Sequence, residues 1–168
     1  MWTLGAYDGL LKECILGIKN RGHKALAKEL SRAAAKAFLE AFPQQDRIHA
    51  VMAVPSSKQG QKFRGFSLPQ MIEEGLRETA GWPTLSPSLR RCYRAAAKSS
   101  RGLGRSERLA RVQTADVQAF EEAKGKGLLL VDDVVTTGAT LTRCVTQADQ
   151  QGFAEVYCFA LADHRPVD

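Results

Sequence analysis

Long apolar runs are missing from this sequence: none approaches the roughly 20 residues that a membrane-spanning helix needs. Its first residues, MWTLGAYDGLLKE, also lack the basic segment, apolar stretch and small-residue cleavage site of a signal peptide. These absences argue against a membrane partner and predict a cytoplasmic protein.

Cysteine and histidine are scarce, and neither is spaced for metal binding or nucleophilic catalysis. The four cysteines, at 14, 92, 144 and 158, form no CxxC pair and match no zinc-ligand spacing. The three histidines pair with no serine or cysteine in a triad-like pattern. We therefore expect buried free thiols in a reducing compartment and no metal site built by the protein alone.

What the sequence does contain is an ordinary globular composition with an uneven basic charge. The 168 residues, 44% of them hydrophobic, suit a single domain spanning 1–168. The net charge is +6, and between 90 and 111 eight basic residues accompany one acid, Glu107. We interpret about 90–112 as a mobile basic loop that attracts phosphates, since so many like charges repel unless an anion is near.

Apolar periodicity predicts alternating helices and strands. Four segments have helical spacing, and three short apolar runs are typical of buried strands. The helical segments are 10–18, 26–42, one starting near 69 and one following 135; the strands are 48–55, 127–134 and 155–164. This alternation predicts an α/β fold with a central, mainly parallel twisted sheet flanked by helices.

The segment LLLVDDVVTTGATL, residues 128–141, carries the most specific pattern. An apolar strand, central in a parallel sheet, meets Asp132 and Asp133 at its end. Three threonines and a glycine then open a helix, where free amides make an anion site. These residues are Thr136, Thr137, Gly138 and Thr140. In open α/β sheets, ligands bind beyond this end of the strands.

The two halves of the segment require different chemistry. Carboxylates repel phosphate, so the acids suit sugar hydroxyls or a cation, whereas the threonine loop suits a monophosphate. A phosphorylated ribose satisfies both. The alternative, surface acids beside an ordinary threonine N-cap, explains each half separately but not their combination. The segment therefore predicts binding of a ribose-5-phosphate-containing ligand, above all 5-phosphoribosyl-1-pyrophosphate (PRPP).

This segment resembles the PRPP motif of type I phosphoribosyltransferases, and nearly the whole chain resembles their competence-protein F (ComF) family. The other residues that carry the resemblance are Tyr7-Asp8-Gly9, Ile18-Lys19-Asn20-Arg21-Gly22, Ala53-Val54-Pro55, Arg64-Gly65-Phe66 and 101–108. Ser67, Ser100 and Arg111 depart from the family pattern. The resemblance implies a type I phosphoribosyltransferase fold with a small N-terminal hood, which we place within 1–45.

In that family, the acidic pair contacts the ribose hydroxyls and the following loop holds the 5-phosphate. The resemblance implies the first role for Asp132 and Asp133, which with Arg64 are the expected catalytic residues. It implies the second for Thr136, Thr137, Gly138, Ala139 and Thr140. Mg²⁺ is the expected cofactor, held mainly through PRPP near the acidic pair. The family's four-cysteine zinc module is absent from this sequence, so zinc is not implied; a trimmed chain and a variant without the module both stay open.

Two further loops are expected to handle the pyrophosphate. One follows the strand at 48–55 and offers hydroxyl, ammonium and bidentate guanidinium donors. The other is the basic loop, as a lid over the leaving group. The candidates are Ser56, Ser57, Lys58 and Arg64 in the first loop, and Arg101, Arg105 and Arg108 in the second. Solvated charge is the alternative for both.

Three functions fit these features. The first is Mg²⁺-dependent transfer of phosphoribosyl from PRPP to an acceptor that the sequence does not identify. The second is binding of a phosphorylated ribose or nucleotide without catalysis. The third follows from the family name: an accessory role in DNA uptake, with DNA or a competence helicase as partner. The basic stretch permits the third, but the sequence has no aromatic-interleaved groove for stacking bases. The oligomeric state stays undetermined.

Overall fold

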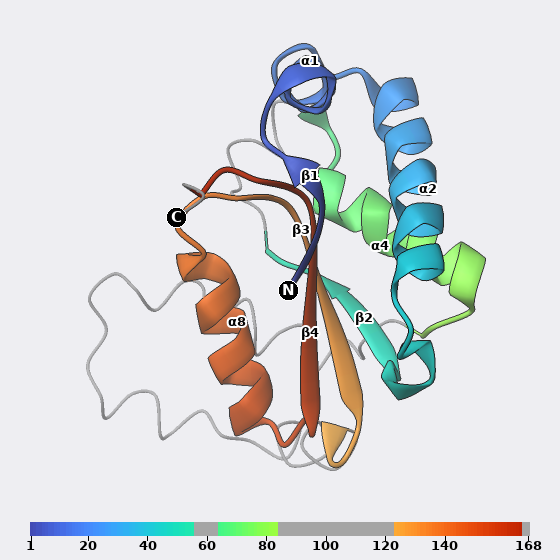
Figure 1. Ribbon diagram of the computed structural model, residues 1–168, viewed down its shortest axis with the longest axis vertical. Helices are drawn as coiled ribbons and strands as arrows, with labels where there is room; N and C mark the ends of the chain where they lie inside the picture. Colours follow the sequence, from blue (N-terminus) through green and yellow to red (C-terminus); the bar gives the residue numbers. More distant parts are fainter. Residues whose placement is uncertain (56–63, 84–122, 166–168) are drawn as a thin grey trace.

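The computed structural model describes residues 1–55, 64–83 and 123–165, and these form a parallel sheet covered by helices (Figure 1). The four strands have the order β1-β4-β3-β2, and all neighbours are parallel. The strands are β1 (Trp2–Ala6), β2 (Ala50–Ala53), β3 (Gly127–Val135) and β4 (Glu155–Asp163). The helices are α1 (Gly9–Arg21), α2 (Lys24–Ala41), α4 (Leu68–Ala80) and α8 (Ala139–Gln150), with a short 3-10 helix, η1 (Gln45–Arg47). The predicted α/β fold is confirmed.

Helices cover both faces of the sheet because the side chains of each strand alternate between them. In β3, Leu129 and Val131 pack into the core shared with α1, α2 and α4, whereas Leu128 and Leu130 pack on the side of α8. All four side chains are fully buried. Figure 1 shows α8 on the opposite side of the sheet from α2 and α4. A strand covered in this way requires the continuous apolar run that the sequence contains.

The first strand, β1, is a part of the sheet that the sequence analysis does not predict. It pairs in parallel with β4, with Trp2 opposite Phe159. The Trp2 ring also meets the Phe42 ring edge-on, with centroids 5.7 Å apart. Residues 1–45, where we place a hood, thus supply an edge strand and two helices packed on one face of the sheet. Their role as a hood stays a prediction.

Leu10 and Leu26, the first apolar residues of two predicted helical segments, are exposed. In α1, Ile15 and Ile18 are completely buried, but Leu10 is 76% exposed. Leu11, four residues before Ile15, lies on the buried side, and Leu10 is rotated about 100° from it around the helix. In α2, Leu26 is likewise exposed. The apolar stripes are therefore narrower at the start of both helices than the sequence suggests.

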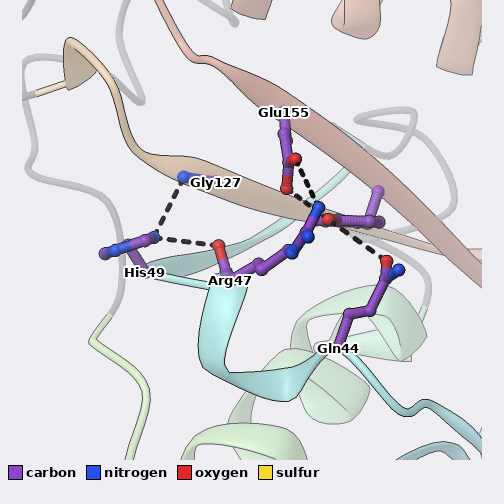
Figure 2. Close-up of polar contacts among 6 residues, drawn as sticks. Gln44, Arg47, His49, Gly127 and Glu155 are labelled. Carbon is purple, nitrogen blue, oxygen red and sulfur yellow. Dashed lines mark hydrogen bonds and ion pairs between the residues drawn. The ribbon is translucent and has the colours of Figure 1, made fainter.

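At the amino end of β3, the chain passes so close to η1 that only glycine fits. A Cβ atom on Gly127 would lie 1.9 Å from the carbonyl oxygen of Arg47. The Gly127 N–H donates to His49 Nδ1 at 3.1 Å (Figure 2). The backbone N–H of His49 donates to the Gly127 carbonyl at 2.9 Å. Nearby, Arg47 Nη1 and Glu155 Oε1 form an exposed ion pair at 2.9 Å. Contacts of the Gly127 backbone with Arg47 and His49 thus hold β3 close to η1 at this end of the sheet.

The structure bears on two features that the sequence analysis considers, membrane-spanning helices and free cysteines. Within them, no helix combines the length and the apolar character that crossing a bilayer would require. Cys14, Cys144 and Cys158 are free thiols; Cys144 is buried and the other two are half-buried. Cys92 lies outside the described residues.

Candidate functional site

The acidic pair lies at the carboxyl end of β3, inside the strand. Because successive side chains of a strand point to opposite faces, the two carboxylates separate. Asp132 lines an open hollow together with residues 134–141, on the side of α8. Asp133 lies on the side of α1, where its Oδ1 accepts a hydrogen bond from Lys19 Nζ at 2.8 Å. The structure thus places both acids at one strand end but in different surroundings.

The loop after β3 supplies the rest of the hollow. Gly138 is the N-cap of α8 and has φ +72°, a left-handed conformation that glycine adopts at little cost. Thr137 Oγ1 accepts a hydrogen bond from the Ala139 N–H at 3.4 Å. Thr136, Thr137 and Ala139 are exposed, and Thr140 is half-buried. The first turn of α8 contains no acid. The first N–H groups of a helix lack intrahelical partners, so this turn can bind an anion.

The electrostatics of Asp132 differ from those of an ordinary surface acid. Burial, with a smaller contribution from the neighbouring Asp133 charge, raises the pKa of the Asp132 carboxyl to about 7. Two interactions oppose the rise: the hydrogen bond from the Asp133 N–H to Asp132 Oδ1 at 2.8 Å, and the positive charge of the Lys19 ammonium. Asp132 is therefore close to half-protonated at neutral pH, as suits a group that exchanges protons with a ligand.

Lys19 is a residue of this site to which sequence reasoning assigns no role. It lies 114 positions from Asp133, and its only signal in the sequence is its place in the pattern Ile18–Gly22. Besides the ion pair, its backbone carbonyl accepts a hydrogen bond from Arg64 Nη1 at 3.3 Å. The buried Nε of Arg64 has no partner among the described residues. The structure therefore connects Arg64, a predicted site residue, to the acidic pair through Lys19.

Most of the predicted pyrophosphate donors lie outside the described residues. Of the residues proposed for the two loops, only Arg64 belongs to the part of the chain that the structure describes. The ones that lie outside it are Ser56, Ser57, Lys58, Arg101, Arg105 and Arg108. Their roles stay predictions.

Asp132 and Asp133 offer the oxygen donors that Mg²⁺ prefers, but they do not form a cage for it. Across residues 1–55, 64–83 and 123–165, no three histidine, cysteine or acidic side chains come together closely enough to hold a metal ion. One of the two carboxylates is already paired with Lys19. Mg²⁺ at this site would need phosphate oxygens from a ligand to complete its coordination shell, so the donor set fits a metal that arrives with PRPP.

The part of the chain that carries the site matches a known protein family. Residues 86–166, which include β3, its loop and α8, match the family "Phosphoribosyl transferase domain". The chain is 26% identical over 144 residues to competence protein ComFC of Bacillus subtilis (strain 168), a match that covers 84% of this chain and 55% of that protein. The chain thus spans about half the length of this curated relative.

A solved structure shows a weaker likeness. The crystal structure of HGPRT-ase from Leishmania tarentolae in complex with GMP aligns with a TM-score of 0.36 and 13% identity. The alignment covers 86% of this chain and 69% of that one, and it is too weak to bear on function. The family match and the curated relative support a likeness of this chain to ComF-family type I phosphoribosyltransferases.

Proposed function

We propose that this chain binds PRPP with Mg²⁺ and transfers the phosphoribosyl group to an acceptor still to be identified. The observation that carries this proposal is the hollow at the carboxyl end of β3, which Asp132 lines together with the loop 136–140. A phosphate bound at the start of α8 would bring its ribose within reach of Asp132. Strand, loop and helix therefore suit a ribose 5-phosphate. As the sequence analysis predicts, we expect the protein to act in the cytoplasm.

In this proposal, the loop and the acids divide the ligand between them. The free N–H groups of the first α8 turn and the hydroxyls of Thr136, Thr137 and Thr140 donate to the 5-phosphate. The carboxylate of Asp132 accepts from a ribose hydroxyl. Asp133, held by Lys19, binds the sugar from the side of α1. The ribose would thus be fixed at its phosphate and at its hydroxyls.

The transfer breaks the bond from C1 to pyrophosphate and forms a bond from C1 to a nitrogen of the acceptor. Positive charge develops on the ribose as the first bond lengthens, as in the cleavage of glycosides. The residues of this chain hold the ribose in place and offset the charge of the leaving pyrophosphate. Arg64 is the described residue suited to the second task, and Mg²⁺, when bound with PRPP, supplies further positive charge.

Asp132 is the better candidate for accepting a proton from the acceptor. A group whose pKa lies near the working pH is an efficient proton acceptor, and the pKa of Asp132 is raised to about 7. The sequence alone names no base, although Asp133 is one candidate; its carboxylate is ion-paired with Lys19, which suits it less to this task. We therefore propose Asp132 as the base and Asp133 as a fixed anion.

Phosphorus NMR tests the transfer directly. PRPP and Mg²⁺ are incubated with the protein and a panel of purine and pyrimidine bases and other amines. We expect free pyrophosphate only when one particular acceptor is present, and none with Asp132→Asn. Binding of PRPP without release for any acceptor would instead favour the non-catalytic binding protein. Absence of PRPP binding would contradict both.

The name of the relative motivates a second proposal, a role in DNA uptake with DNA or a competence helicase as partner. The basic stretch 90–111 would carry the contact with DNA, through phosphates and therefore with a strong dependence on salt. Affinity for single-stranded DNA, measured over a range of salt concentrations, tests it. Unchanged affinity in the triple variant Arg101→Ala/Arg105→Ala/Arg108→Ala would exclude this stretch as the DNA site.

A further inference from the structure

Lys19 contacts two separate parts of the site through two different chemical groups. Its ammonium is 2.8 Å from Oδ1 of Asp133, at the end of β3. Its backbone carbonyl is 3.3 Å from Nη1 of Arg64, just before α4. Carbonyls in the last turn of a helix have no intrahelical partner, and the carbonyl of Lys19 in α1 is satisfied by this guanidinium. The last turn of α1 thus joins the acidic pair to Arg64.

The surroundings of the Lys19–Asp133 pair distinguish it from a surface ion pair. The side chains of Lys19 and Asp133 are 27% and 14% exposed, against 53% and 40% for Arg47 and Glu155 at the other end of the sheet. Partial burial reduces screening by water and salt. Among the described residues, the side-chain partner of Asp133 is Lys19, which contacts its Oδ1 atom.

We propose that Lys19 is a positioning residue of the ribose site, because its ammonium orients Asp133 while its carbonyl orients Arg64. The inference rests on the proposed function, since it assumes that the acidic pair binds the ribose of PRPP. Without the ammonium, the carboxylates of Asp132 and Asp133 would face each other's charge without compensation, and Asp133 would lose its fixed orientation. Lys19 thus fixes the position of the acidic pair, which we assign to the sugar, relative to Arg64, which we assign to the pyrophosphate.

The competing explanation is that the ion pair only fastens α1 to the sheet. Calorimetry of PRPP binding with Mg²⁺, well below the unfolding temperature, separates the two explanations. Lys19→Met removes the charge but keeps an unbranched side chain and the carbonyl that binds Arg64. The matched control is Glu155→Gln, which breaks an ion pair of similar length at the far end of the sheet.

We expect Lys19→Met to weaken PRPP binding by about tenfold or more, the effect of about 1.4 kcal/mol. Glu155→Gln should leave the affinity unchanged, and Lys19→Arg, which keeps the charge, should recover part of the loss. If Lys19 acts through Asp133, the double variant Lys19→Met/Asp133→Asn should bind PRPP as Asp133→Asn does. A purely structural contact predicts no such coupling in the affinity for ligand.

Wild-type affinity in Lys19→Met, whether or not its unfolding temperature falls, would overturn the inference and leave the proposed function standing. No PRPP binding by the wild type would overturn both. Lys19→Gln replaces Lys19→Met if the latter does not fold, and the same outcomes apply to it. Additive losses in the double variant would also overturn the inference, since Lys19 would then act independently of Asp133.

Discussion

Asp132 and Asp133 are consecutive residues whose carboxylates lie on opposite faces of β3. Asp132 lines the hollow beside α8, and Asp133 Oδ1 lies 2.8 Å from Lys19 Nζ on the side of α1. The strand's alternation and the position of α1 thus place one acid in a partly desolvated hollow and the other against an ammonium. Two identical side chains acquire different chemistry from their surroundings, and this difference leads to the first prediction.

Replacing Asp132 should change how stability depends on pH. The carboxyl has a pKa of about 7 in the folded chain and about 4 in an unfolded one, so the folded chain binds its proton more tightly. This group therefore contributes stability below about pH 4 that is lost as pH rises to about 7, by at most about 1.4 kcal/mol per pH unit. Asp132→Asn should remove this loss.

Urea unfolding of wild type and Asp132→Asn, at intervals from pH 4 to pH 8, measures the difference. The difference in free energy of unfolding should grow in favour of Asp132→Asn up to about pH 7 and then stay constant. The groups that face Asp132 and affect it are Asp133 and Lys19, so Asp133→Asn should shift the profile to lower pH. A constant difference over the whole range would contradict the raised pKa.

Because Gly138 has a left-handed backbone conformation, replacing it with a residue that has a side chain should lower the stability of the protein. A Cβ there would meet only Val135 Cγ1 at 4.0 Å, so space is available, but φ is +72°. We expect Gly138→Ala to lower the free energy of unfolding by about 1–2 kcal/mol through backbone strain alone. The control is Gly17→Ala, inside α1 with open space around it, which should stabilise by about 0.5–1 kcal/mol. Equal effects of the two substitutions in urea unfolding would refute the strained loop.

Gly127 should tolerate no side chain for a different reason. An added Cβ would lie 1.9 Å from the Arg47 carbonyl oxygen, and the backbone there is held by hydrogen bonds between Gly127 and His49. Gly127→Ala should therefore destabilise by about 3 kcal/mol or more, beyond the usual range for overpacking. Thermal unfolding checks this. Near-wild-type stability would mean that β3 and η1 do not approach so closely.

Local pattern was sufficient to predict most of the sheet. β2 is apolar throughout, and β3 and β4 each contain a long apolar run, because a strand covered on both faces can hold few polar residues. β1 escapes this reasoning: Trp2–Ala6 is short, lies at the sheet edge and alternates between exposed and half-buried residues. It is defined by its pairing with β4, a contact between opposite ends of the chain.

The candidate site likewise has a part that the sequence predicts and a part that depends on tertiary packing. Asp132 and the loop 136–140 are contiguous in the chain, so their spacing alone predicts a shared site. The pairing of Lys19 with Asp133 depends on how α1 packs against the sheet, which no local pattern records. The separation of the two acids could have been inferred from strand alternation, because the predicted strand at 127–134 already contains both of them.

The most direct test of the ribose-5-phosphate site is a calorimetric titration of PRPP with Mg²⁺ into the wild type and into Thr137→Val/Thr140→Val. The double substitution removes two hydroxyls of the loop and keeps nearly the same side-chain shapes. We predict saturable binding to the wild type at one site and an affinity at least about tenfold lower in the variant. Equal affinities, or no binding to the wild type, would contradict the account.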